Sequence, residues 1–361
     1  MKQLLFIVLT FTSVIVATAQ QKNKTENVIL ITLDGFRWQE VFNGADSSLM
    51  RQQKFLADPQ AKEKFWRNDL TERRRALLPF FWTTIASQGQ LYGNRTAGCS
   101  VNVTNNQWFS YPGYSELLTG KADNERIHSN DKLYNPNTNV LEFLNSQPSF
   151  KGKVAAFSSW DVFPYIVNDK RSGVFVSGGL VEASGTINER EKMMNQLMAT
   201  LPNPLGDVRL DAFTFYYGME YLKKNKPRAM YFAFDETDDF AHAGEYGAYI
   251  NAARHTDGLI SELWNYLQSD PAYKNKTTMV LTCDHGRGNN ATEWKDHGQK
   301  INGADQIWFA VIGPDTKAKG EIKEGQFYQN QIAKTLASFL GLDYKGEGKI
   351  GEVIMPVVSM K

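Results

Sequence analysis

Four short segments, far apart in the sequence, carry side chains that could hold metal ions around one hydroxyl group. In chain order, the residues are Asp34 at the end of an apolar run, Ser110 in Phe-Ser-Tyr-Pro-Gly, Asp238 with His242, and Asp284 with His285 followed by His297. Three carboxylates and three imidazoles are donors that suit zinc, and two such ions need about six protein ligands plus a bridging group. The set therefore predicts two metal ions beside a serine.

A two-metal site next to a hydroxyl predicts phosphoryl chemistry. The negative oxygens of a phosphoryl group repel a nucleophile, so cations on the attacking and leaving oxygens lower the barrier, and one cation also lowers the pKa of a bound hydroxyl. Ser110 is the candidate nucleophile because it precedes a Tyr-Pro-Gly turn that can lead into the apolar helix 114–118. A helix N-terminus offers amide hydrogens to an anion. We expect Ser110 to be activated by metal, without a general base.

Each segment also has a purely structural interpretation. An aspartate that ends a strand, such as Asp34, is commonly a turn or cap residue. Asp238 and His242, spaced by four, could be a solvent-exposed helical pair, since other acidic residues surround them. The chain has only 5 histidines, however, and three of them fall in these segments. That concentration favours the functional interpretation.

The elements between these segments predict an α/β fold with a mostly parallel central sheet and helices on both faces. Buried strands are expected at 28–33, 154–157, 230–234, 278–283 and 307–312, and amphipathic helices at 210–224, 246–267 and 327–340. The ligand segments follow strand ends, where open α/β sheets place their sites. Two stretches, 46–75 and 177–204, look inserted and could form lids over the site. We expect residues 20–361 to form one catalytic domain.

The N-terminus and the composition bear on localisation and partners. Residues 1–19 have a basic start, a short apolar core and an Ala-Thr-Ala end, which predicts a cleaved signal peptide and a periplasmic or secreted protein without a membrane span. With 40 basic and 39 acidic residues, the charge is balanced, so a nucleic acid polymer is not an expected partner. We expect a small phosphate ester as the substrate. The two cysteines, Cys99 and Cys283, are expected to be buried thiols.

Taken together, these segments resemble the alkaline phosphatase superfamily, and most closely its nucleotide pyrophosphatase/phosphodiesterase branch. Residues 27–37 are similar to the opening strand of that superfamily, and residues 110–120 to the nucleophile segment of the branch, in which Thr-Gly follows an aromatic-Pro pair. The remaining ligand segments occur in the family's order. The resemblance spans residues 27 to about 297.

The resemblance implies a role for each of these residues. One zinc ion would be held by Asp238, His242 and His297, and the second by Asp34, Asp284 and His285, with the Ser110 oxygen at the second ion. The family also uses an asparagine after the nucleophile to hold a phosphoryl oxygen, and Asn130 is the corresponding residue although the spacing is one residue short.

The substrate is predicted from a segment that departs from the monoesterases of the superfamily. Where those enzymes carry Arg or a Lys-Arg pair against the doubly charged phosphate, this chain has Trp160 and Phe163, which suit the organic group of a diester. Cations that could still reach the phosphate are Lys170, Arg171 and Arg287.

We therefore expect an exported, two-zinc phosphoric ester hydrolase that forms a phosphoseryl intermediate and prefers diesters. A phosphomonoesterase with the same metals is the alternative. A sulfatase is less favoured, because the Cys/Ser-x-Pro-x-Arg segment that is matured to formylglycine is absent. A candidate from another class is an exported binding protein that has lost turnover.

Overall fold

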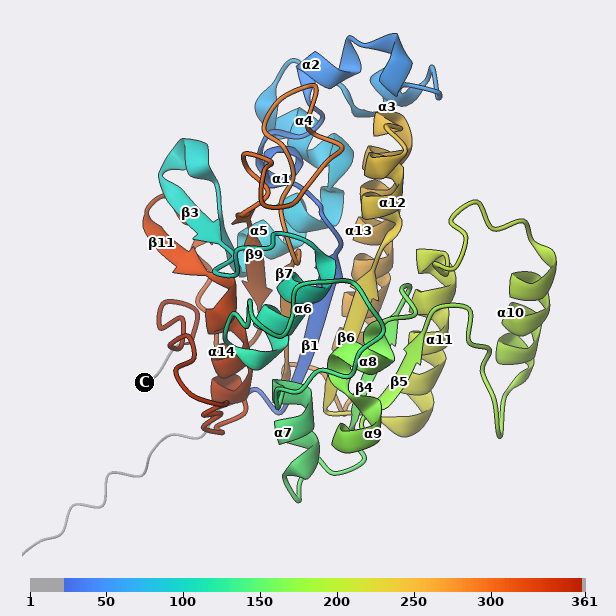
Figure 1. Cartoon of the computed structure of the whole chain (residues 1–361), viewed down its shortest axis with the longest axis vertical. Helices are drawn as coiled ribbons and strands as arrows, with labels where there is room; N and C mark the ends of the chain where they lie inside the picture. Colours follow the sequence, from blue (N-terminus) through green and yellow to red (C-terminus); the bar gives the residue numbers. More distant parts are fainter. Residues whose placement is uncertain (1–22, 359–361) are drawn as a thin grey trace, which may run out of the picture.

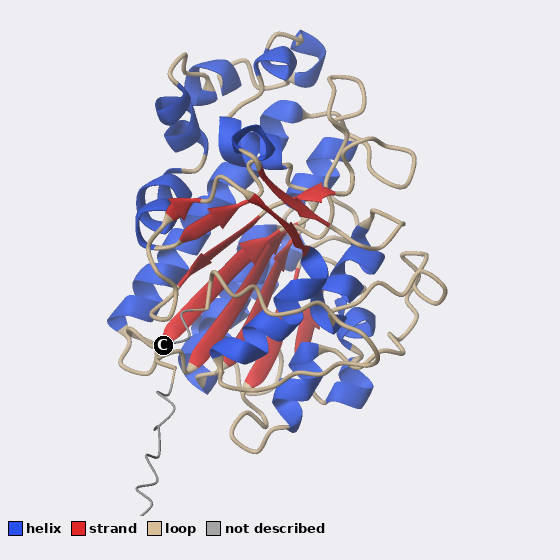
Figure 2. Cartoon of the chain, turned by 90° about the vertical axis from the view of Figure 1, so that its left-hand side faces the viewer, coloured by secondary structure: helices blue, strands red, loops and turns tan. Residues whose placement is uncertain are grey.

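The computed structural model describes residues 23–358, so the predicted signal peptide lies outside the described residues. In this part of the chain, an eight-stranded sheet forms the centre of the molecule (Figure 2). From edge to edge, its strands are β10 (Gly320–Glu321), β2 (Gln90–Tyr92), β9 (Phe309–Ile312), β7 (Thr277–Thr282), β1 (Asn27–Leu33), β6 (Ala229–Phe234), β4 (Val154–Ser158) and β5 (Phe175–Gly178). A second sheet contains β11 (Gly325–Tyr328), β3 (Cys99–Asn102) and β8 (Gln306–Ile307).

The centre of the large sheet is parallel, as predicted. β1 pairs in parallel with β6 and β7, and β4 pairs in parallel with β6 and β5. All seven residues of β1 are buried. A continuous apolar strand of this kind is typical of a parallel sheet that is covered on both faces.

The expected parallel strand at 307–312 is wrong in two respects. Ile307 belongs to β8 of the small sheet, whereas Phe309–Ile312 form β9, which runs antiparallel to both β7 and β2. Trp308 separates the two strands, with 2% of its surface exposed and its ring nitrogen donating to the Phe36 carbonyl. A β-branched apolar run indicates a buried strand but does not encode its direction.

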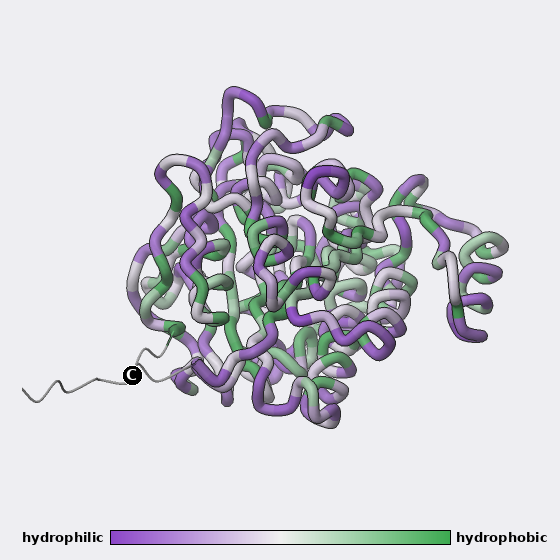
Figure 3. Tube along the Cα trace, turned by 90° about the horizontal axis from the view of Figure 1, so that it is seen from below, coloured by the Kyte–Doolittle hydropathy of each residue, from purple (hydrophilic) through white to green (hydrophobic). Residues whose placement is uncertain are grey.

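Two helical layers cover the large sheet (Figure 1). On one face lie α6 (Ser110–Thr119), α7 (Val140–Ser146), α8 (Phe163–Val167), α9 (Asp169–Ser172) and α14 (Ile332–Phe339). The other layer contains α11 (Asp211–Asn225), α12 (Glu236–His242) and α13 (Tyr246–Ser269), while α1 (Trp38–Asn43) and α4 (Leu70–Leu77) pack against each other above the sheet, with α4 also against α13. Shorter elements are α2 (Ser47–Met50), η1 (Gln53–Phe55), α3 (Ala61–Phe65), the π-helix η2 (Phe81–Ile85), α5 (Ala86–Gln88), η3 (Arg95–Ala97) and η4 (Gln329–Gln331). Hydrophobic segments gather in the interior and hydrophilic ones on the outer loops (Figure 3).

The helices predicted at 210–224 and 246–267 agree with α11 and α13 to within two residues. The helix predicted at 327–340 begins later, at Ile332, because residues 325–328 pair with β3 as strand β11. The Tyr328 amide donates to the Gln331 side chain, which marks the change from strand to helix. A short run of apolar residues ahead of a helix can fit both the two-residue spacing of a strand and the spacing of a helix, so the sequence does not show where the helix begins.

The two stretches that look inserted occupy different places. Residues 46–75 form α2, η1, α3 and α4 above the sheet, near the long loop 286–303 (Figure 1). In the other stretch, α10 (Glu189–Thr200) stands at the edge of the molecule, where Tyr217 of α11 donates to Asn195. No hydrogen bond joins α10 to a predicted ligand among residues 23–358.

Cys99 and Cys283 are buried and free, as predicted. None of the helices described is long and apolar enough to span a membrane.

Candidate metal and catalytic site

The predicted ligands converge at the carboxyl ends of β1, β6 and β7, which are the upper ends of these strands in Figure 1. The strand register explains this convergence. Leu33 lies opposite Phe234 in β6, and Thr32 lies opposite Thr282 in β7, so the three strands end together. Asp34, helix α12 and Asp284 therefore emerge at the same edge of the sheet.

The first group of ligands comes from α12 and the loop after β7. Nε2 of His242 lies 3.1 Å from an oxygen of Asp238 and 2.9 Å from Nε2 of His297. Ligand atoms of Asp238, His242 and His297 lie within 4.8 Å of one another. This is the set predicted for one metal ion, and about half of the His242 side chain is exposed.

The second group is buried beside the first. Nε2 of His285 lies 3.2 Å from Oδ1 of Asp34 and 3.5 Å from Oδ2 of Asp284. Both oxygens are buried, and neither accepts a hydrogen bond from the described residues. Buried carboxylate oxygens without donors are uncommon and need a partner. A cation is such a partner, so the donor set fits a bound metal.

Asp238 faces both groups. Its Oδ1 lies 3.8 Å from Nε2 of His285 and 3.8 Å from Nε2 of His297. The ligand atoms that lie within 4.8 Å of one another in the second group are those of Asp34, Asp238 and His285. The sequence assigned Asp238 to the first ion only, whereas the structure puts its carboxylate between the two groups.

Arg287, which the sequence suggested as a possible phosphate contact, instead contacts the same carboxylate. Its guanidinium pairs with Asp238 and donates to the Gly35 and Lys295 carbonyls at 3.1 and 2.7 Å. Gly35 has a φ of +55°, and a Cβ at this position would lie 2.6 Å from Nε of Arg287. The glycine after Asp34 therefore makes room for the arginine.

Ser110 begins helix α6, beside the second group. Its Oγ lies 3.4 Å from Nε2 of His285, and 6% of its surface is exposed. The helix approaches β7 closely, because a Cβ on Gly113 would lie 2.4 Å from the Asp284 carbonyl oxygen. Two residues before the serine, Trp108 has a φ of +55°. A bulky residue in this conformation is strained, and such strain is concentrated at functional sites.

Asn130 lies against the nucleophile segment. Its Oδ1 accepts a hydrogen bond from the backbone amide of Tyr111 at 3.0 Å. This bond occupies the carbonyl end of the side chain, so the NH2 end is the one that can donate to a substrate oxygen. The side chain is exposed to solvent.

The pKa shifts follow from crowding of the carboxylates. Burial, and then the charge of Asp34, raises the pKa of Asp284 to about 8. For His285, burial alone lowers the pKa, but the Asp284 and Asp34 charges outweigh it and raise the pKa to about 9. Burial lowers the pKa of His242 and of His297, which keeps both imidazoles neutral, as metal ligands must be. A cation at the carboxylates would reverse the shift at Asp284.

Tyr114 is a further site residue that the sequence analysis did not single out. Its hydroxyl donates to Oδ2 of Asp34 at 2.8 Å, and 1% of the residue is exposed. Its position four residues after Ser110, one turn along α6, is a signal that could have found it.

Phe163 lies in the core and does not face a substrate. Its ring packs against Tyr114 and Tyr231 with centroids 4.8 and 5.4 Å apart, and 1% of the residue is exposed. This differs from the predicted pocket wall, since a wall residue must present a surface. Trp160, after β4, is partly buried against the core.

The candidate cations are engaged in other contacts. Arg171 pairs with Glu142 and donates to the carbonyls of residues 135–137, and Lys170 lies 4.7 Å from the centre of the Tyr134 ring. Arg287 is occupied by Asp238 as described above.

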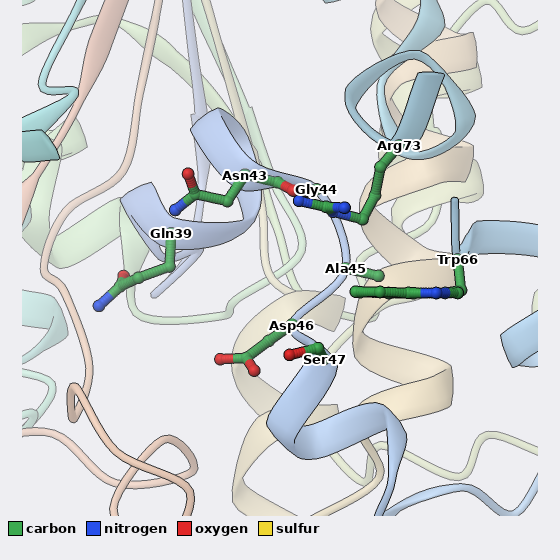
Figure 4. A pocket seen from close by; sticks show the side chains of 8 residues that line it. All are labelled: Gln39, Asn43, Gly44, Ala45, Asp46, Ser47, Trp66 and Arg73. Carbon is green, nitrogen blue, oxygen red and sulfur yellow. Dashed lines mark hydrogen bonds between the residues drawn. The ribbon is translucent and has the colours of Figure 1, made fainter. Parts of the chain in front are cut away.

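A separate recess of about 230 Å³ lies next to α1 (Figure 4). The residues that line it are Gln39, Asn43, Gly44, Ala45, Asp46, Ser47, Trp66 and Arg73. None of these is a predicted ligand, and the Arg73 side chain donates to the backbone carbonyls of Asn43 and Arg67, both at 2.7 Å.

Solved structures with the same fold include an alkaline phosphatase, a lipoteichoic acid synthase and a phosphonate monoester hydrolase. The alkaline phosphatase PafA has a TM-score of 0.59 at 12% identity, and the alignment covers 94% of this chain and 100% of that one. The lipoteichoic acid synthase LtaP from Listeria monocytogenes has a TM-score of 0.57 at 14% identity, with 93% and 75% covered. The phosphonate monoester hydrolase of Agrobacterium radiobacter has a TM-score of 0.56 at 14% identity, with 92% and 77% covered. At these identities the likeness establishes the fold alone.

A comparison with curated protein sequences finds no match. The family model described as Sulfatase matches residues 83–342, which is most of the chain. The chain therefore belongs to the Sulfatase family, within the alkaline phosphatase-like superfamily of hydrolases.

Proposed function

We propose that the protein is an exported two-zinc hydrolase of phosphoric esters, similar to the nucleotide pyrophosphatase/phosphodiesterase branch, and that Ser110 is its nucleophile. One observation carries the proposal. The Ser110 hydroxyl, at the N-terminus of α6, lies 3.4 Å from Nε2 of His285, and the same nitrogen lies 3.2 and 3.5 Å from buried oxygens of Asp34 and Asp284 that accept no hydrogen bond from the described residues. The proposed nucleophile Ser110 and the proposed ligands Asp34 and Asp284 therefore all lie close to His285.

The chain would hold the two ions with the residues predicted from the sequence. Asp238, His242 and His297 would bind one ion, and Asp34, Asp284 and His285 the other; Oδ1 of Asp238 also lies 3.8 Å from Nε2 of His285. When bound, zinc would supply positive charge at the attacking and leaving oxygens and lower the pKa of the serine hydroxyl. Tyr114 would orient Asp34 through its hydroxyl.

The remaining steps follow from the residues around Ser110. The Ser110 hydroxyl would lose its proton to solvent, and its Oγ would form a bond to phosphorus while the bond from phosphorus to the leaving oxygen breaks and that oxygen takes up a proton from solvent. The backbone amide of Ser110 and the Asn130 NH2 group would donate to the phosphoryl oxygens, since the Tyr111 and Gly113 amides already donate to Asn130 and Phe109, and Pro112 has no amide hydrogen. Water would then attack the phosphoseryl group, release the phosphate product and restore the serine.

A diester is the preferred substrate in this proposal. The organic group of a diester suits the partly buried Trp160, and Lys170, Arg171 and Arg287 are all engaged elsewhere. A phosphomonoesterase with the same ions is the alternative. It would need a cation that can reach the second negative charge of a monoester dianion.

A sulfate ester is less favoured, although the family model bears the name Sulfatase. In the segment Ser110-Tyr-Pro-Gly-Tyr114, a tyrosine stands where the sulfatase maturation segment has arginine. That tyrosine already donates to Asp34. The serine would therefore act without conversion to formylglycine.

The test compares three nitrophenyl substrates on zinc-loaded protein: a phosphate monoester, a bis-nitrophenyl phosphate diester and a sulfate ester. We expect turnover of the diester to be fastest and turnover of the sulfate to be negligible. Faster monoester turnover would favour the alternative, and faster sulfate turnover would refute the proposal. Processing after residue 19 in the native host, read by N-terminal sequencing, tests export separately.

A further inference from the structure

Lys132 is held close to the nucleophile by two contacts to one residue. The Tyr111 amide donates to Asn130, and the Tyr111 hydroxyl donates to the Leu133 carbonyl. Tyr111 directly follows Ser110 in the chain. Lys132 lies between Asn130 and Leu133 in the chain, and both of these residues contact Tyr111, so the Lys132 backbone lies near the serine.

The Lys132 ammonium forms an ion pair with Asp161, the residue after Trp160. About half of the lysine side chain and 28% of the aspartate side chain are exposed. An ion pair at this exposure stabilises the fold little and is easily opened. The ammonium can therefore exchange its carboxylate partner for a substrate oxygen.

We propose that the Lys132–Asp161 pair determines whether the site prefers phosphate monoesters or diesters, with Asp161 neutralising the Lys132 ammonium, a cation that could otherwise stabilise the second charge of a monoester. This inference rests on the proposed phosphoric ester hydrolysis. It adds two specificity-determining residues that contact neither the predicted metal ligands nor the serine.

The physical reason is a difference of one unit of charge. A monoester dianion carries about one more negative charge than a diester, so any charge added near the phosphoryl group acts more strongly on the monoester. With the pair intact, the net charge of Lys132 and Asp161 is zero. Removing the carboxylate leaves one positive charge, and removing the ammonium leaves one negative charge.

The magnitude follows from Coulomb's law. For two unit charges on the order of 7 Å apart, in surroundings between bulk water and a protein surface, that law corresponds to a change of roughly threefold to fiftyfold in relative rate. A shift of about tenfold is therefore expected for each single variant, in opposite directions.

The experiment measures the ratio of monoester to diester kcat/KM in zinc-loaded protein. Asp161→Asn should raise this ratio by about tenfold, and Lys132→Ala should lower it by about tenfold. The double variant should return close to the wild-type ratio, because both charges are gone. Asp58→Asn is the matched control, since Asp58 forms a comparably exposed pair with Lys64 at 2.9 Å in the 46–75 stretch, and it should leave the ratio unchanged.

A second measurement separates this inference from the proposed function. Inorganic phosphate and dimethyl phosphate are titrated calorimetrically into the same zinc-loaded variants, so that the charge effect is read even if no ester is turned over. Opposite shifts of the two single variants support the inference in either assay. Ratios within about twofold of the wild type in both single variants, or shifts of the same sign, overturn it. Absence of turnover with opposite shifts in binding would refute the proposed function alone.

Discussion

Replacing Tyr114 with phenylalanine should weaken metal binding without destroying the fold. The Tyr114 hydroxyl donates to Oδ2 of Asp34 at 2.8 Å, while Oδ1 of the same carboxylate lies 3.2 Å from Nε2 of His285. Burial raises the pKa of Tyr114 well above its usual value, so the hydroxyl stays protonated and donates. It therefore fixes which oxygen of Asp34 faces the ligand group.

The expected magnitude comes from the kind of bond that is lost. A hydrogen bond to a charged group contributes about 1.5–3 kcal/mol, and removing a partner that orients a metal ligand typically costs 10- to 100-fold in affinity. These two ranges agree, since about 1.4 kcal/mol corresponds to a factor of ten. We expect the affinity for zinc to fall by roughly 10- to 100-fold in Tyr114→Phe.

The assay is a zinc titration in competition with a chromophoric chelator, followed by kcat at saturating zinc. Tyr231→Phe is the matched control. Tyr231 is also fully buried and has a hydroxyl bond, 3.0 Å to Thr32, but that bond does not touch a predicted ligand. The free energy of unfolding should fall by about 1 kcal/mol in Tyr231→Phe and by about 1.5–3 kcal/mol in Tyr114→Phe, because only the second bond goes to a charged group.

Only Tyr114→Phe should lose affinity for zinc, and saturating zinc should restore most of its kcat. Equal zinc affinity in the two variants would refute the assignment of Tyr114 as an orienting residue. An unchanged affinity in both would also remove Asp34 from the ligand set.

Three further outcomes are expected. Chelation should abolish activity, and zinc should restore it better than magnesium, because imidazole-rich sites favour borderline metals; activity without bound transition metal would contradict this. Ser110→Ala should lower the rate by roughly a thousandfold or more while zinc content stays constant, and Ser87→Ala, an exposed serine on α5, should leave the rate unchanged. Trp160→Lys should raise monoester turnover relative to diester turnover by roughly tenfold, and a wild-type preference for the monoester would contradict the diester assignment.

The central strands could be predicted from the sequence because their chemistry is unambiguous. Residues 27–33 and 277–282 are continuous apolar or β-branched runs, each followed at once by a polar segment. Such a run has no exposed face, so it belongs in a covered sheet, and the polar residue after it lies at the edge. The sequence therefore predicts that Asp34 and Asp284 lie at the edge of the sheet.

The direction of β9 and the place of Phe163 could not be predicted in the same way. Strand direction depends on how the chain returns to the sheet, and an aromatic residue after a strand fits both a pocket wall and a core. In the structure, Phe163 is a core residue because Tyr114 and Tyr231, which come from distant segments, pack against its ring. The role of Arg287 was hidden for the same reason, since its partner Asp238 lies 49 residues away.

Helix α6 is the element that turns these separate strand ends into one site. All ten of its residues are buried, although its mean composition is only moderately apolar. Glu116 explains how such a helix is held. Its carboxylate accepts hydrogen bonds from the amides of Thr104 and Asn105 at 2.8 and 2.7 Å, and Asn105 in turn accepts from the Trp108 amide at 3.0 Å. Glu116 of α6, acting through Asn105, therefore holds the strained turn at Trp108 that precedes Ser110.

The same helix contacts each part of the site through a different turn position. Ser110 meets His285, the Tyr111 amide meets Asn130, Gly113 packs against the Asp284 backbone, and Tyr114 meets Asp34. A rotation of α6 about its axis would break all four contacts together, because they lie within one turn and a third of the helix. The position of Ser110 and the orientation of the predicted metal ligand Asp34 are thus set by one rigid body, which accounts for the burial of its polar residues.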